Sequence, residues 1–167
     1  SAGGYQKSEL EKVYTFSGAV ANRRADHVVA SLLKYVTDID EVKGLGFCVT
    51  VDHARFMCRY FNEHNIPSIF LTGQSPDEER KTAKQLLVSG EIRFIFVVDI
   101  YNEGVDIPEV DTVLFLRPTE SLTIFLQQLG RGLRLSVGKT ELTVLDFVAQ
   151  SNRKYDFASR FRALMLN

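Results

Sequence analysis

Two arginines three positions apart carry the most chemistry in this sequence. Arg131 and Arg134 lie in the stretch Gln-Gln-Leu-Gly-Arg-Gly-Leu-Arg at 127–134, which we expect at the end of an amphipathic helix. A helical spacing of three places both side chains on one face. Each guanidinium stays protonated and offers five donors, so the pair suits a multiply charged oxyanion such as a triphosphate. The alternative is a pair of solvated arginines at a helix end, and the spacing alone favours neither reading.

A second polar stretch lies between two apolar runs and reads Asn-Glu-Gly-Val-Asp-Ile-Pro at 102–108. Together the two stretches resemble the last two motifs of a superfamily-two helicase of the DEAD/DEAH type, in its second, C-terminal RecA-like domain. The resemblance covers roughly residues 45–147. It is specific because the motifs come in the right order with apolar strands between them.

This resemblance implies a site for ATP. In the family the QxxGRxxR motif supplies arginine fingers to ATP bound between two RecA-like domains, which gives Arg131 and Arg134 catalytic roles. The residues implied to bind ATP are Gly104, Asp106, Gln127 and Gly130. Asp106 is expected to touch the ribose and to couple nucleotide to nucleic acid. Its alternative is a turn carboxylate that bonds its own backbone before Pro108.

The resemblance also implies a track for nucleic acid across the ends of the strands. The residues expected there are Thr50, Thr72, Gly73 and Asn102. A plain loop at 72–73 is an equal alternative. Many relatives carry a phosphate-binding threonine where this chain has Val98, so that contact is absent or moves to Asn102. Glu103 stands where RNA helicases usually have arginine, and the stretch looks more like bacterial restriction and DNA-repair helicases. DNA is therefore favoured, with RNA possible.

The parts that hold ATP in a complete motor are missing from the sequence. Gly138-Lys139-Thr140 is not a phosphate-binding loop, because Leu133 stands where its first glycine belongs and a strand follows instead of a helix. We therefore expect ATP and Mg²⁺ to be held mainly by an N-terminal RecA-like domain, and this piece alone to be inactive. The competing interpretation is a non-catalytic RecA-like module for nucleic-acid binding or scaffolding.

Alternating strands and helices are expected to position these residues. The strands are predicted at 47–51, 68–71, 92–98, 110–116 and 142–147, and the helices at 22–35, after Asp52, at 76–89, from 121 and at 152–166. The fold class is α/β, a RecA-like three-layer sandwich with a mainly parallel sheet and helices on both faces. The most apolar run, 92–98, is expected at the centre of the sheet, buried on both faces.

Local signals place the helix ends. Asp52 is expected to cap the second helix. His53 is interpreted as an exposed first-turn histidine, with a phosphate contact as the alternative. The sequence 75–78, Ser-Pro-Asp-Glu, has the pattern of a capping box, and Gly90 should end that helix.

Composition bounds the class of protein. The 167 residues are 45% hydrophobic and 25% charged with a net charge of −1, which suits one globular domain without a global basic field. Residues 1–20 are expected to be an N-terminal extension with a cloning remnant, and 21–167 the RecA-like domain. No apolar run approaches a membrane span, so a soluble, cytoplasmic protein is expected. Cys48 and Cys58 are expected to be buried, reduced thiols, and no metal site is predicted.

Overall fold

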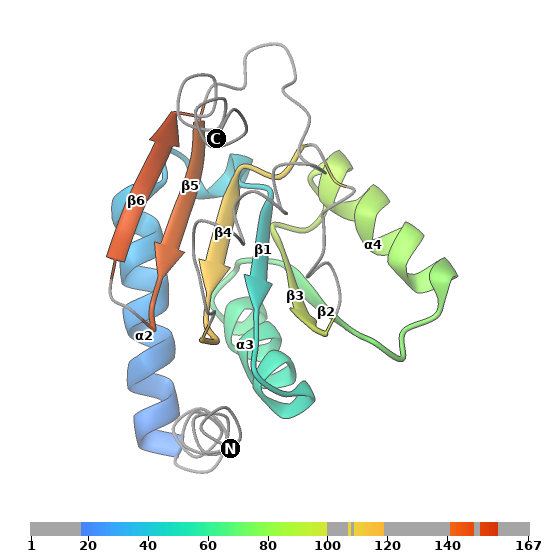
Figure 1. The fold of residues 1–167 in the computed structure, drawn as a ribbon, viewed down its shortest axis with the longest axis horizontal. Coiled ribbons are helices and arrows are strands. Elements are labelled where there is room, and N and C mark those ends of the chain that lie inside the picture. The colour runs from blue at the N-terminus through green and yellow to red at the C-terminus, as the bar shows by residue number, and fades with distance from the viewer. Residues whose placement is uncertain (1–17, 100–106, 108, 119–140, 149–150, 157–167) are drawn as a thin grey trace, which may run out of the picture.

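The fold is built on a six-stranded sheet (Figure 1). This computed structural model describes residues 18–99, 107, 109–118 and 141–148, together with the backbone of 151–156. The strands lie in the order β2-β3-β1-β4-β5-β6. Their bounds are β1 Gly44–Phe47, β2 Ser68–Thr72, β3 Phe94–Val98, β4 Thr112–Phe115, β5 Glu141–Asp146 and β6 Ser151–Asp156. Strands β1 to β5 pair in parallel, and β6 is antiparallel to β5.

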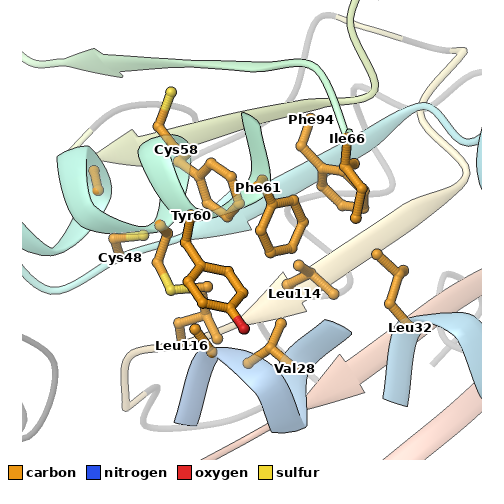
Figure 2. Packing of buried hydrophobic residues seen from close by; sticks show 14 of the residues in the cluster. Val28, Leu32, Cys48, Cys58, Tyr60, Phe61, Ile66, Phe94, Leu114 and Leu116 are labelled. Atoms are coloured by element: carbon orange, nitrogen blue, oxygen red, sulfur yellow. The ribbon is translucent and has the colours of Figure 1, made fainter. Parts of the chain in front are cut away.

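Helices cover both faces of this sheet. Helices α2 (Gly18–Tyr35) and α3 (Val51–Glu63) pack on one face, and α4 (Asp77–Ser89) packs on the other. The side chains of β3 alternate between the two faces, so Phe94 and Phe96 meet α3 while Ile95 and Val97 join the layer under α4. Figure 2 shows the first of these layers, where α2 and α3 converge on the strands. The predicted α/β sandwich with a mainly parallel sheet is confirmed.

Strand β1 begins earlier than the sequence indicated. It spans Gly44–Phe47, whereas the prediction ran from Phe47 to Val51 and left both glycines outside the strand. Val51 is instead the first residue of α3. The two glycines lie in register with Phe94 and Phe96 of β3. A Cβ at Gly44 would overlap the ring of Phe94, and one at Gly46 would lie 2.5 Å from Cδ1 of Phe96. The glycines are therefore strand residues that make room for two aromatic rings, a need that strand propensity does not reveal.

Two further predictions about the sheet are wrong. Strand β3 is buried on both faces, as expected, but it lies between β2 and β1 and not at the centre. The segment predicted as a helix at 152–166 begins with strand β6, so β5 is not the last strand. Residues 151–156 form a complete antiparallel ladder along β5, and the apolar residues whose spacing predicted the helix all lie after residue 156. Residues 157–167 lie outside the described part.

The helix ends also differ in detail. Thr50, and not Asp52, is the N-cap of α3, because its Oγ1 accepts from the backbone N–H of His53 at 3.1 Å. Pro76 stands at the N-cap position of α4 without a side-chain bond, so the predicted capping box is not formed. Gly90 ends α4 in the left-handed region with φ 85°, as predicted.

The two cysteines are buried and free, as predicted. Burial raises the pKa of both thiols. At Cys48 the charge of the neighbouring Cys58 raises the pKa further. None of the described helices is long and apolar enough to cross a bilayer.

Candidate nucleic-acid interface at the strand ends

The carboxyl ends of β1, β2 and β3 meet at one edge of the sheet. Their parallel registers pair Phe47 with Val97 and Thr72 with Val98. The loops that follow these strands therefore leave on the same side, where open α/β sheets bind ligands. Thr50, Thr72 and Gly73 all lie in these loops or at their start. The structure thus brings together the three predicted nucleic-acid residues that it describes.

The loop after β1 is held by two hydrogen bonds, both of which involve His53. The Val49 N–H donates to Nδ1 of His53 at 3.1 Å, and the His53 N–H donates to Oγ1 of Thr50. Thr50 is half-buried, and its hydroxyl oxygen already accepts the hydrogen bond that caps α3. Its hydroxyl hydrogen can still be donated outward, which is what a phosphate oxygen would require.

His53 differs from its interpretation as an exposed residue. It is fully buried beneath the start of α3. Desolvation lowers the pKa of His53 to about 3, so the ring is neutral at physiological pH. A neutral Nδ1 that accepts a hydrogen bond fixes the tautomer with the proton on Nε2. His53 therefore organises the loop and does not present a charge to a ligand.

The turn after β2 is stabilised by its own side chains. Thr72 N–H donates to Oγ of Ser75 at 2.9 Å, Gln74 N–H donates to Oγ1 of Thr72 at 3.1 Å, and Ser75 N–H donates to the Thr72 carbonyl. Ser75 is thus used by the turn, which explains why it does not cap α4. Gly73 is exposed at the apex.

Two residues that the sequence did not single out flank Gly73. Arg80, one turn into α4, donates from Nη2 to the Gly73 carbonyl at 3.3 Å. Asp99 follows β3 in the left-handed region with φ 58°, and a Cβ at Gly73 would lie 3.8 Å from its carbonyl oxygen. Aspartate tolerates this conformation better than most residues. The strand-ending position of Asp99 was the available signal, whereas the contact of Arg80 depends on the tertiary fold.

The remaining predicted site residues lie outside the described part of the chain. They are Arg131, Arg134, Gly104, Asp106, Gln127, Gly130 and Asn102. Val98 is described, and it is a buried core residue at the end of β3. Over the described residues, no group of three or more histidine, cysteine, aspartate or glutamate side chains could hold a metal ion.

The family comparison decides what kind of domain this is. The profile described as the helicase conserved C-terminal domain matches residues 27–136. The chain belongs to this family. It is the C-terminal RecA-like domain of a superfamily-two helicase, and the matched range contains both motif stretches, 102–108 and 127–134.

Curated relatives of this domain include a putative helicase and a subunit of a restriction enzyme. The chain is 32% identical over 108 residues to a putative ATP-dependent helicase, IRC3, of Saccharomyces cerevisiae, covering 65% of this chain and 16% of that protein. It is 30% identical over 135 residues to the type I restriction enzyme EcoKI endonuclease subunit of Escherichia coli, covering 72% and 12%. The chain therefore spans a small part of these relatives.

Solved structures show the same fold. The Escherichia coli DEAD-box protein SrmB, bound to a regulator of ribonuclease activity, matches with a TM-score of 0.58 at 21% identity, over 73% of this chain and 70% of that chain. The C-terminal domain of the DEAD-box protein Dbp5 matches with a TM-score of 0.58 at 17% identity, over 74% and 68%. These matches confirm the RecA-like architecture.

Proposed function

We propose that this domain is the C-terminal half of an ATP-dependent helicase or translocase motor. Arg131 and Arg134 supply arginine fingers to ATP that a first RecA-like domain holds together with Mg²⁺. Gly104, Asp106, Gln127 and Gly130 line the same cleft from this side. The observation that carries the proposal is the family match over 27–136, which includes both motif stretches. The paired arginines support the same proposal, because a domain that only binds nucleic acid or acts as a scaffold does not need an arginine finger.

The chemistry assigned to this chain is electrostatic. When the two domains close, guanidinium groups at 131 and 134 would stabilise the negative charge that develops on the transferred phosphoryl group. A finger of this kind is worth on the order of 10³ to 10⁵ in rate, or roughly 4 to 7 kcal/mol. The same closure and reopening would move the two halves along a strand.

The strand ends at β1 and β2 supply part of the nucleic-acid track. Thr50 and Gly73 lie at the carboxyl edge of the sheet, and the exposed turn at Gly73 is stiffened by Thr72, Ser75 and Arg80. A preorganised turn can hold a backbone phosphate with little loss of entropy. Asn102 would extend this track. DNA is the favoured substrate because Glu103 replaces the arginine of the RNA-helicase branch.

ATP turnover of the full-length protein tests the proposal. Single-stranded DNA, duplex DNA and RNA are added separately to the wild type, to Arg131→Ala and to a control, Arg24→Ala, which removes an exposed arginine of α2. We expect DNA-stimulated turnover in the wild type and the control, and at least a thousand-fold loss in Arg131→Ala with nucleic-acid binding nearly unchanged. Retained turnover in Arg131→Ala would refute the finger assignment.

Absence of turnover with all three nucleic acids would favour a non-catalytic RecA-like module. The coupling role of Asp106 has its own test, because Asp106→Ala should reduce the stimulation of ATPase by DNA more than it reduces basal turnover. An unaltered stimulation factor would count against that role.

A further inference from the structure

Strand β2 is an edge strand with backbone groups directed away from the sheet. Its neighbour is β3, and the Pro67 carbonyl accepts from Arg93 N–H at 2.6 Å, so residue 67 faces β3. Because successive residues of a strand alternate, Ser68, Phe70 and Thr72 direct their N–H and C=O groups outward. Such a row of groups is a template for pairing with a strand of another chain.

The side chain of Asn62 occupies the first of these positions. Its Oδ1 accepts from the Ser68 N–H at 2.8 Å, and its Nδ2 donates to the Ser68 carbonyl at 3.0 Å. A primary amide carries the same donor and acceptor as a peptide group. The Asn62 amide therefore binds Ser68 as the peptide of a neighbouring strand would. The Cys58 thiol adds a bond to the same carbonyl at 3.3 Å.

The chain reversal after α3 fixes this side chain in place. Asn65 adopts the left-handed region with φ 61°, and Ile66 N–H donates back to the Phe61 carbonyl at 2.9 Å. The last turn of α3 thereby lies beside the start of β2. The short loop between α3 and β2 thereby holds Asn62 beside Ser68. The hydrogen bonds between these two residues therefore require little additional ordering of the chain.

The other end of β2 is also occupied. The Thr72 N–H donates to Oγ of Ser75 at 2.9 Å. Within the described part of the chain, this leaves Phe70 as the outward residue of β2 whose backbone groups have no hydrogen-bond partner. The Phe70 ring itself packs on the face of the sheet that α3 covers, with the Arg55 guanidinium over it at 5.7 Å. A single open residue offers too short a ladder for another strand.

We propose that Asn62 closes the β2 edge and keeps the domain from pairing edge to edge with a second copy of itself. This role requires neither ATP nor nucleic acid. The Asn62 side chain takes the place that a covering strand has in other sheets, and Ser75 completes the closure at the far end.

Sedimentation of the 167-residue chain at rising concentration tests the proposal, with Asn62→Ala beside the control Glu63→Ala. Glu63 is an exposed neighbour in the same helical turn. We expect the weight-average mass of Asn62→Ala to rise toward twice the monomer mass while the wild type and Glu63→Ala stay constant. A folded Asn62→Ala that remains monomeric at every concentration would overturn the proposal.

Amide hydrogen exchange of the wild type tests whether the β2 edge is closed, and this test holds even if Asn62→Ala does not fold. The expected pattern along β2 is slow exchange at Ser68, fast exchange at Phe70 and slow exchange at Thr72. In a folded Asn62→Ala the amide at 68 should become at least ten-fold faster. Exchange at Ser68 in the wild type as fast as at Phe70 would show that the edge is not closed there.

Discussion

His53 shows how one buried residue ties the stability of the domain to pH. Its ring lies under the first turn of α3 and accepts a hydrogen bond from Val49. Desolvation lowers its pKa from 6.5 to about 3 in the folded state, whereas the unfolded chain has the ordinary value. Between these two pH values the unfolded state binds more protons, so stability falls as pH falls. The domain therefore has its full stability with respect to His53 above pH 6.5, and it loses part of this stability as the pH falls toward 3.

His53→Asn should therefore flatten the acid side of the stability profile. At pH 5 the wild-type histidine costs about 2 kcal/mol relative to pH 7.5, and asparagine removes this loss because it does not titrate. Asparagine still offers an acceptor to Val49, although the smaller side chain lowers stability at neutral pH. Urea unfolding at several pH values measures the effect. A pH slope in His53→Asn equal to that of the wild type would contradict the assignment.

At the level of elements, β1 and β3 fit together through paired glycines and phenylalanines. Phe61 of α3 packs edge to face on Phe94 and Phe96, with centroids 5.3 and 4.9 Å away. The rings lie over Gly44 and Gly46, and all three phenylalanines are fully buried. The rings cannot move aside, so the pairing of β1 with β3 depends on the absence of two Cβ atoms.

Gly46→Ala should destabilise the domain by about 1 to 3 kcal/mol, because the added methyl overlaps a fixed ring. Thermal and urea unfolding measure the change. Gly18→Ala is the matched control, since nothing lies within 4 Å of a Cβ at the first residue of α2, and it should be neutral or slightly stabilising. Equal stability of the two variants would show that β1 can shift to accommodate the methyl.

Helix α4 is anchored at its C-terminal end by a lysine from the loop before β1. Nζ of Lys43, which precedes β1, donates to the carbonyls of Val88 at 2.8 Å and Leu87 at 3.2 Å. A cation at a helix C-terminus interacts favourably with the dipole. Lys43→Met should cost about 1 kcal/mol in urea unfolding, whereas Lys81→Met, on the exposed side of α4, should change little. A loss of equal size in both would argue for a general charge effect.

The sequence identified most elements but missed those that depend on partners far along the chain. Apolar runs located four of the strands, and Gly90 marked the end of α4 correctly. The glycines of β1 were left outside the predicted strand because the reason for them lies in Phe94 and Phe96, about fifty positions away. Strand β6 was missed because its pairing with β5, and not its composition, makes it a strand.

The candidate site was predictable to a similar degree. Motif order was enough to select the family and to place Thr50, Thr72 and Gly73 at one edge of the sheet. The burial of His53 and the bond from Arg80 to Gly73 could not be inferred, because both depend on how helices pack against the loops.

For the molecule as a whole, the two thiols report on global unfolding. Cys48 follows β1 and Cys58 lies in α3, and both belong to the same buried layer (Figure 2). Burial raises the pKa of each, so little thiolate is available for reaction. Both should react with a disulfide reagent only at the rate of global unfolding, and urea should accelerate them together. A thiol that reacts rapidly without denaturant would indicate local opening near it.

The reversal at β6 determines where a reporter can be attached. Asp156 pairs with Glu141 at the amino end of β5, whereas Ser151 pairs with Asp146 at the carboxyl end. Five strand residues separate the two ends, or roughly 17 Å. A fluorophore or surface tether placed at position 156 would thus stand clear of the edge that carries Thr50 and Gly73. Single-molecule recordings of movement along nucleic acid could use that position without obstructing the proposed track.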